Sequence, residues 1–263
     1  MLEDLRALGI GQGDLLMIHA SLRKIGLARS RFGDGGAVLL LDALDTAVGP
    51  DGKLLMTLGS HYEMDWVNLR PEAERGALLA GSEPMDAARA PAMADVGWLG
   101  ETLRRRPGTL LSANPSGRFG ARGARAAELV AGQPWHDYYG PGSPLEKLCN
   151  WGGRILRLGA DPDTVTALHY AEYLARLPMK HRTRWDYLMR DAGGVPRHVW
   201  IECLDDSTGI ADWDGEDYFA AILKAYLELG RHSEGLVGEA QAELIDAADL
   251  VEFGARWMEK NLS

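Results

Sequence analysis

Short apolar runs of strand length alternate with longer segments of helical spacing in the N-terminal part of the chain. Residues 14–19 and 53–58 are nearly continuous apolar runs, the pattern of strands buried on both faces of a parallel sheet. Residues 38–48 lie between them and are apolar over a helical length, and Gly49-Pro50-Asp51-Gly52 ends this segment. Strand, helix and strand in this order predict a βαβ unit with a right-handed crossover.

Periodicity and end signals predict further elements along the chain. Residues 110–112 form a brief strand, and Pro144 suits the first position of a helix that begins after Ser143. Residues 60–95 lack clear periodicity and contain several prolines, which predicts a long insertion or lid with a short helix at 72–79. The remaining helices are expected at residues 2–8, 95–106, 124–131, 217–229 and 246–262.

The pattern changes to a period of two between residues 187 and 204. Val199, Ile201 and Cys203 lie at every second position, and Ala192-Gly193-Gly194 separates two runs rich in β-forming residues. This combination predicts a β-hairpin.

Alternating strands and helices followed by a hairpin predict the α/β class. We expect residues 1–263 to form a single domain in which helices flank a central, mostly parallel sheet and the antiparallel β-hairpin is an addition. The sequence contains no internal repeat, low-complexity tract or linker that would divide it.

Composition and charge restrict the class of partner. The chain is 46% hydrophobic but has no apolar run of 18 residues, and its N-terminus is charged and amphipathic, so a cytoplasmic protein without a membrane anchor is expected. A net charge of −10 argues against nucleic acid, whose phosphates need a basic face, and suits a cationic ligand, although such charge can also serve solubility alone. Cys149 and Cys203 lie far apart without a CxxC motif, so neither a metal site nor a disulfide framework is expected.

One histidine stands out by its position. Residues 154–159 resemble a short strand, residues 161–164 include helix-capping types, and the following helical spacing puts His169 in the first two turns with Glu172 three residues on. A helix N-terminus lowers the pKa of an imidazole, whereas a nearby carboxylate raises it and orients the ring. His169 is therefore a candidate base, although a single histidine on a helix is more often structural.

Charged residues gather in two segments of opposite sign. Residues 23–31 include four basic and no acidic side chains, and residues 202–217 include seven acidic and no basic ones. Because Asp205 and Asp206 follow the hairpin, we expect them at an exposed rim. Either cluster can also be a solvated surface without a ligand.

Seven segments, in order over nearly the whole chain, carry a family resemblance. They are residues 19–26 (HASLRKIG), 97–104 (GWLGETLR), 107–109 (PGT), 143–145 (SPL), 152–159 (GGRILRLG), 166–172 (TALHYAE) and 249–253 (DLVEF). These segments resemble the aminoglycoside N(3)-acetyltransferases of the antibiotic N-acetyltransferase family, which is unrelated to the common acetyltransferase superfamily. The glycine-rich residues 33–36 match no known phosphate-binding loop.

The resemblance implies acetyl-CoA as co-substrate, bound by the loop after the first strand, and a polycationic aminoglycoside as acceptor, without a metal. It implies that His169 is the catalytic base, and we expect Glu172 to hold or polarise it. The acetyl-CoA contacts that we expect are His19, Ala20, Ser21, Leu22, Arg23, Ile25, Gly26, Ser112, Asn114 and Thr166. The carboxylates expected to bind the acceptor are Glu63, Asp65, Asp86, Asp205 and Asp206.

Coenzyme A is anionic, so the basic segment 23–31 together with Arg118 and Arg122 can face its phosphates. The family usually has Ser-x-His-Pro where this chain has Ser112-Ala113-Asn114-Pro115, and residues 60–84 are longer than is typical. Direct transfer in a ternary complex, by a monomer or a homodimer, is expected.

Two alternatives remain open. The chain could be a related N-acetyltransferase that acts on another amine, such as an amino sugar or an aminophosphonate, or a protein that binds the drug without turnover. A covalent mechanism through Cys149 or Cys203 is less favoured, because neither cysteine falls in a matched segment.

Overall fold

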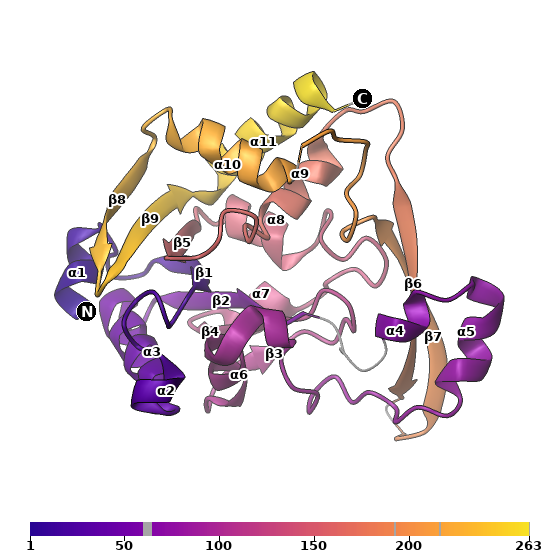
Figure 1. Cartoon of the computed structure of the whole chain (residues 1–263). Coiled ribbons are helices and arrows are strands. Elements are labelled where there is room, and N and C mark those ends of the chain that lie inside the picture. Colours follow the sequence, from indigo (N-terminus) through magenta and orange to yellow (C-terminus); the bar gives the residue numbers. More distant parts are fainter. Residues whose placement is uncertain (60–64, 192, 216, 263) are drawn as a thin grey trace.

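A seven-stranded sheet forms the centre of the computed structural model, which describes residues 1–59, 65–191, 193–215 and 217–262 (Figure 1). The strand order is β3-β4-β2-β1-β5-β9-β8. The strands are β1 (Leu15–Ala20), β2 (Lys53–Thr57), β3 (Leu110–Leu111), β4 (Phe119–Gly123), β5 (Arg154–Leu158), β8 (His232–Val237) and β9 (Ala240–Asp246).

The parallel pairing expected from the sequence lies at the middle of this sheet. Strand β1 pairs in parallel with β2 on one side and with β5 on the other. Antiparallel strands extend the sheet outward, β4 and β3 beyond β2, and β9 and β8 beyond β5. The α/β class is confirmed, and the described sheet is mixed because the strands that the sequence did not predict, β4, β8 and β9, are antiparallel.

Side chains alternate across the central strands and form two apolar layers. Met17 of β1 belongs to one layer and Ile18 to the other. The layer that contains Ile18 is covered by α1 (Leu2–Ala7), α3 (Gly35–Val48) and α6 (Gly97–Arg105). The layer that contains Met17 is covered by α7 (Ala126–Val130), α8 (Pro144–Asn150), α9 (Leu168–Leu174), α10 (Tyr218–Leu227) and α11 (Ala247–Asn261). A short helix, α2 (Arg29–Phe32), precedes α3.

The predicted hairpin is confirmed as a separate two-stranded sheet. Strands β6 (Arg182–Arg190) and β7 (Pro196–Leu204) pair along their whole length, and Gly194 has a positive φ of 79° in the turn between them. Strand β6 begins at Arg182, earlier than expected, because its first residues are exposed or half-buried and contain no run of apolar positions. Two short helices, α4 (Asp65–Asn68) and α5 (Glu72–Leu79), lie against the hairpin at the right of Figure 1. The helix expected at 72–79 is thereby confirmed.

A buried ionic cluster fixes these helices on the hairpin. Asp186 of β6 is 1% exposed, and its carboxylate accepts hydrogen bonds from Arg75 at 3.1 Å, Arg184 at 3.1 Å and His198 at 2.9 Å. The side chain of Asn68 donates to the backbone carbonyl of Asp186 and accepts from its N–H. Burial alone raises the pKa of Asp186, but the three donors hold this pKa below its usual value. The charged carboxylate of Asp186 therefore anchors α5, and the backbone of Asp186 anchors α4.

The helices of the described residues are all too short or too polar to cross a membrane.

Candidate functional site

The carboxyl ends of β1, β2 and β5 lie at one edge of the sheet, where ligands of open α/β folds usually bind. Strand β3 runs antiparallel to β4, and β4 antiparallel to β2, so β3 also ends at this edge. The segments expected to bind acetyl-CoA therefore follow strands that end together: residues 20–26 after β1, Thr166 in the segment after β5, and residues 112–114 after β3.

Residues 20–26 form a tight turn beside the end of β5. The N–H of Ser21 donates to the carbonyl of Leu158 at 2.9 Å, and the N–H of Ile25 returns to the carbonyl of Ser21 at 3.0 Å. Gly26 has a φ of 89° and lies so close to Glu239 that a Cβ atom would approach its side chain within 2.8 Å. The end of the Glu239 side chain can move, so it is chiefly the positive φ that disfavours a larger residue at this turn.

His19 lies just before this turn with a buried, neutral ring. It stands opposite Arg157 of β5, and burial together with the charge of Arg157 lowers the pKa of His19 to about 3. The Nε2 atom of His19 has no hydrogen-bond partner among the described residues. Arg157 donates to the backbone carbonyls of Ala160 and Asp161, and so shapes the segment that leads to α9.

Ser112 and Asn114 serve the local backbone at the end of β3. The Oγ atom of Ser112 accepts from the N–H of Phe119 at 2.9 Å. The amide nitrogen of Asn114 donates to the carbonyls of Pro134 and Trp135, and its oxygen accepts from the N–H groups of residues 116 and 117. Asn114 therefore holds two loops together.

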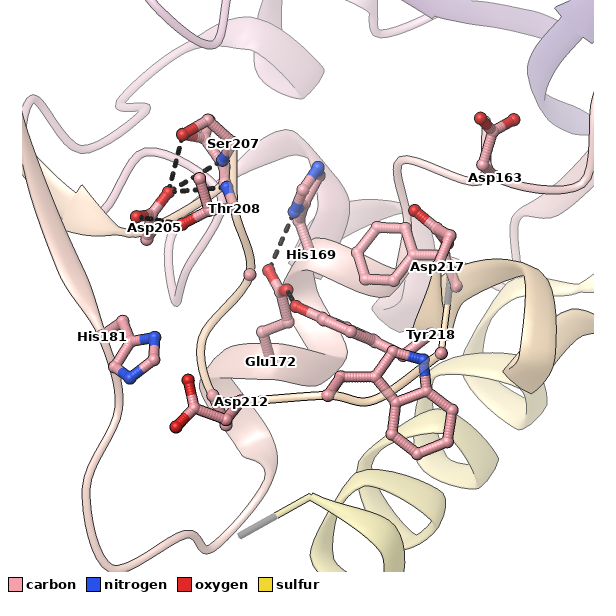
Figure 2. Close-up of a pocket in the computed structure, with 16 residues that line it drawn as sticks. Asp163, His169, Glu172, His181, Asp205, Ser207, Thr208, Asp212, Asp217 and Tyr218 are labelled. Atoms are coloured by element: carbon pink, nitrogen blue, oxygen red, sulfur yellow. Dashed lines mark hydrogen bonds and ion pairs between the residues drawn. The ribbon is translucent and has the colours of Figure 1, made fainter.

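His169 and Glu172 form a hydrogen-bonded pair on α9. The Nδ1 atom of His169 lies 2.8 Å from Oε2 of Glu172, and the two atoms come from residues three positions apart on one helix. Because a carboxylate only accepts, the proton of the neutral ring lies on Nδ1, and Nε2 keeps its lone pair on the opposite side of the ring. Figure 2 shows this second nitrogen pointing away from Glu172. The helix begins at Leu168, so His169 lies in its first turn, as expected.

Aromatic residues fix the plane of the His169 ring. Tyr139 stacks on it at a centroid distance of 4.8 Å and an angle of 9°, and Phe219 contacts it edge-on at 4.8 Å. The His169 side chain remains 18% exposed, whereas Glu172 is buried beneath it. The hydroxyl of Tyr218 donates to the remaining oxygen of Glu172.

The neighbours of His169 set its proton affinity. Burial lowers the pKa of His169, but the charge and hydrogen bond of Glu172, with further charge from Asp206 and Asp217, raise it above the ordinary value. Burial raises the pKa of Glu172, and its bonds with His169 and Tyr218 oppose this rise. The sequence did not decide whether the helix N-terminus would lower the pKa of His169 or the carboxylate would raise it. In the structure this pKa is raised, so the carboxylate has the larger effect.

His169 opens into a strongly acidic cavity of about 470 Å³ (Figure 2). Its described walls include no lysine or arginine. The acidic residues in these walls are Asp163, Glu172, Asp205, Asp206, Asp212 and Asp217. Several members of the acidic segment 202–217 therefore lie in the same cavity as the candidate base.

The expected exposed rim at Asp205 and Asp206 is wrong, because both side chains are half-buried in the cavity wall. Asp205 accepts hydrogen bonds from the backbone and hydroxyl groups of Ser207 and Thr208, which closes a turn. Asp206 accepts from the hydroxyl of Tyr138 and from Nε1 of Trp185.

Three further carboxylates were expected to bind the acceptor. Glu63 lies outside the described residues, and Asp65 begins α4. Asp86 accepts from the N–H of Ala88 and pairs with Arg89 at 3.5 Å, and it is not part of the described wall around His169.

Arg118 and Arg122 cannot face phosphates as expected, since both are engaged within the fold. Arg118 is fully buried, and its guanidinium donates to the backbone carbonyls of Ala87, Ala90 and Pro91. Arg122 pairs with Asp45 at 2.9 Å. Arg23, in contrast, is exposed in the loop after β1.

Several residues of the site were not predicted from the sequence. Tyr139, Tyr218 and Phe219 surround the His169–Glu172 pair, and His181 lines the cavity although no role was expected for it. A signal existed for Tyr218 and Phe219, because Asp217 before them caps α10 by accepting from the N–H of Ala220 at 2.9 Å. The tyrosine at 139 carried no such signal.

Neither a metal nor a cysteine nucleophile is indicated among the described residues. Groups of three potential ligands close enough to hold a metal ion are absent from them. Burial raises the pKa of Cys149 to about 12 and also raises that of Cys203, so both thiols stay protonated, and neither lines the cavity of His169.

Comparison with known proteins identifies the family. The model of the aminoglycoside 3-N-acetyltransferase family matches residues 17–259. Aminoglycoside N(3)-acetyltransferase III of Serratia marcescens is 38% identical, over 98% of this chain and 95% of the relative. The structure of AAC-IIIb in binary complex with CoASH matches with a TM-score of 0.88 and 37% identity, over 100% of this chain and 96% of that chain. Sisomicin-bound AAC-VIa matches with a TM-score of 0.86 and 36% identity, over 100% and 97% of the two chains. The chain therefore belongs to the aminoglycoside 3-N-acetyltransferase family.

Proposed function

We propose that this enzyme transfers the acetyl group of acetyl-CoA to the 3-amino group of aminoglycoside antibiotics and thereby confers resistance to them. The observation that carries the proposal is the acidic cavity in which the His169–Glu172 pair lies. A polycationic acceptor matches six carboxylates without a competing lysine or arginine in the described walls.

His169 is the general base of this proposal. The acceptor nitrogen forms a bond with the thioester carbonyl carbon, the carbon–sulfur bond breaks, and coenzyme A leaves as a thiolate. The proton lost by the nitrogen passes to Nε2 of His169 and then to the thiolate. Glu172 keeps Nδ1 protonated and stabilises the imidazolium that forms between these steps.

Direct transfer in a ternary complex is favoured over a covalent acetyl-enzyme. A covalent route needs a nucleophile beside the base. Cys149 and Cys203 are outside the described cavity wall, and both thiols have raised pKa values. Proximity of the two bound substrates then supplies much of the acceleration.

In this proposal acetyl-CoA binds along the sheet edge formed by residues 19–26 and the segment before α9. Thr166 lies three positions before His169, and its carbonyl accepts the N–H of His169 at 3.0 Å. The exposed Arg23 is available to a phosphate. Ser112 and Asn114 support the neighbouring loop through their backbone bonds rather than through free polar groups.

The test is an acetylation assay with purified protein, acetyl-CoA and a panel of aminoglycosides, in which released thiol is measured and the product is mapped by NMR. We expect acetylation at the 3-amino group, and no acetyl adduct on the protein after acetyl-CoA alone in mass spectrometry. An amino sugar and an aminophosphonate serve as competing acceptors. Faster thiol release with either of these, or none with any aminoglycoside, would refute the proposed acceptor.

A further inference from the structure

We propose that Tyr218 is a positioning residue for this reaction, which holds the Glu172 carboxylate toward His169 and connects it to the acidic segment 205–217. The proposal rests on the proposed function for its kinetic consequences. Its structural consequence, the proton affinity of His169, can be measured without turnover.

The Tyr218 hydroxyl accepts one hydrogen bond and donates one, and the acceptor of its proton is Glu172. The backbone N–H of Ile210 donates to the hydroxyl oxygen at 3.3 Å, so the single hydroxyl proton is free to point at Oε1 of Glu172. Oε2 of Glu172 meets Nδ1 of His169 at 2.8 Å. Each oxygen of this buried carboxylate therefore has its own donor, and Figure 2 shows the Glu172 carboxylate between His169 and Tyr218.

The backbone around Tyr218 is built to hold the ring in this place. Asp217 caps α10, so that Tyr218 is the first residue of the helix and faces α9. Gly209 has a φ of 95°, and a Cβ atom there would lie 2.7 Å from Cε1 of Tyr218. The segment that contributes Asp205 and Asp212 to the cavity therefore packs directly on Tyr218.

Other charged and titratable groups near Glu172 do not replace this bond. Asp206 and Asp217 add negative charge around His169, and Lys180 donates to the backbone carbonyl of Glu172 at 2.7 Å rather than to its carboxylate. Tyr139 stacks on His169, and His181 lines the far wall of the cavity. In the described part of the chain, Tyr218 and His169 are the two side chains that bond to the carboxylate of Glu172.

The direction in which removal of the Tyr218 hydroxyl shifts the pKa of His169 can therefore be predicted. In Tyr218→Phe the carboxylate of Glu172 loses one donor, and its negative charge is less well stabilised. The pair then binds a proton more tightly, so the pKa of His169 rises. We expect an upward shift of about one pH unit, because a hydrogen bond to a buried charge is among the stronger ones in proteins.

The experiment compares Tyr218→Phe with Tyr226→Phe. Tyr226 lies on the same helix, is fully buried, and donates to the carboxylate of Asp249 at 2.8 Å, remote from His169. The pKa of His169 is measured by NMR titration of labelled imidazole, assigned with His169→Ala. The acid limb of kcat/KM is measured with acetyl-CoA and an accepted aminoglycoside.

We expect Tyr218→Phe to move both the imidazole titration and the acid limb upward by about one unit, and to lower kcat about tenfold with both KM values within about twofold. Tyr226→Phe should move neither. An unmoved His169 titration in folded Tyr218→Phe, or an equal shift in Tyr226→Phe, would overturn the proposal. If the wild-type chain shows no acetyl transfer while the titration shifts, the proposed function fails and the positioning role stands.

Discussion

Glu172 and Asp186 are two carboxylates buried to the same degree, each 1% exposed, but with opposite surroundings. Glu172 faces a histidine and a tyrosine hydroxyl, and neither of these carries a permanent positive charge. Asp186 faces Arg75 and Arg184 as well as His198. Burial therefore raises the pKa of Glu172, whereas the guanidinium groups hold that of Asp186 below its usual value.

The difference separates a carboxylate whose charge balance can change from one whose charge is fixed. A guanidinium keeps its proton at any physiological pH, so the charge of Asp186 is fixed and can only anchor. An imidazole titrates near neutrality, so the charge balance of the His169–Glu172 pair changes when a proton arrives. His169 borders an acidic cavity that can hold a proton donor, whereas Asp186 and its partners are not part of the described wall of that cavity.

The largest expected effect is the loss of turnover in His169→Ala. A positioned base contributes roughly 10²- to 10⁴-fold, so kcat should fall by at least a hundredfold. Binding of acetyl-CoA should persist, and the fold should survive because a helix tolerates alanine well. Steady-state kinetics and calorimetric binding measure the two properties.

His198→Ala is the matched control for this substitution, because His198 also bonds to a buried carboxylate, at 2.9 Å. We expect its kcat to stay within about threefold of the parent, because His198 belongs to the hairpin cluster rather than to the cavity wall. Turnover of His169→Ala within threefold of the parent would remove His169 from the role of base.

The next largest effect is a loss of stability, which we expect to be greater when Asp186 is substituted than when Glu172 is. Asp186→Asn removes the counter-charge of Arg75 and one of the two carboxylates that pair with Arg184, whose other partner is Glu72. We expect the free energy of unfolding to drop by about 2–3 kcal/mol. Because the pKa of Asp186 is lowered in the fold, this stabilisation is present above about pH 4 and is lost as the pH falls through the lowered pKa. Urea unfolding of the parent and of Asp186→Asn at pH 7 and at pH 3 measures the loss of stability and its dependence on pH.

Glu172→Gln provides the other half of the test. The pKa of Glu172 is raised in the fold, so folding already disfavours its charged form. We therefore expect an uncharged glutamine to lower the free energy of unfolding by less than about 1 kcal/mol. Turnover should nevertheless fall by at least tenfold, because the imidazolium loses its counter-charge. A larger loss of stability in Glu172→Gln than in Asp186→Asn would contradict the division drawn between the two carboxylates.

The sequence predicts the parts of this molecule that depend on local pattern. The apolar runs at β1 and β2 and the hairpin turn at Gly194 are visible without a structure. The spacing of His169 and Glu172 is also local, because a helix places residues three apart on neighbouring positions of one face.

Strands with little apolar pattern were missed. β4 (Phe119–Gly123) contains two glycines and an arginine. β8 (His232–Val237) is an edge strand whose residues before Val237 are exposed or half-buried. Pairing with β2 and with β9, rather than intrinsic propensity, makes them strands. β9 (Ala240–Asp246) did carry a readable alternation of buried and exposed positions over its first residues.

Contacts between distant segments explain the remaining differences at the site. Asp206 was expected on a rim because charged residues after a strand are usually exposed, yet Tyr138 and Trp185 draw it into the wall. Tyr218 reaches Glu172 across 46 positions of sequence. Such partners follow from the topology of the whole chain and not from any local spacing.

A smaller effect is expected at the solvent side of the cavity. Asp212 lines the cavity, is exposed, and has no hydrogen bond or ion pair within the described part of the chain, so its carboxylate is available to an ammonium group. Asp212→Asn should raise the aminoglycoside KM about twofold to fivefold and leave that of acetyl-CoA unchanged. Exposed pairs are worth about 0–1 kcal/mol, and a polycation engages several carboxylates.

Asp214→Asn is its control, because Asp214 lies on the same segment but outside the described cavity wall. Kinetics at low and high salt should show the effect of Asp212→Asn shrinking as salt rises. Equal effects of the two substitutions would mean that only the net charge of the segment matters.

The smallest effect is a displacement of the pH profile, and it follows from the sign of one pKa. Glu172, Asp206 and Asp217 raise the pKa of His169 above the ordinary value of 6.5, against the opposing influence of burial. Only the unprotonated ring can accept a proton, so kcat/KM should increase with pH through a midpoint above 6.5 rather than below it.

Asp206→Asn removes one of the three negative charges and should move this midpoint downward by a fraction of a unit. Asp186→Asn should leave the midpoint in place, because the cluster of Asp186 is separate from the cavity. Measurement of kcat/KM from pH 5 to 9, with a second acceptor of different amine pKa, separates the titration of the enzyme from that of the substrate. A midpoint that follows the acceptor and ignores Asp206→Asn would show that the amine, and not His169, governs the acid limb.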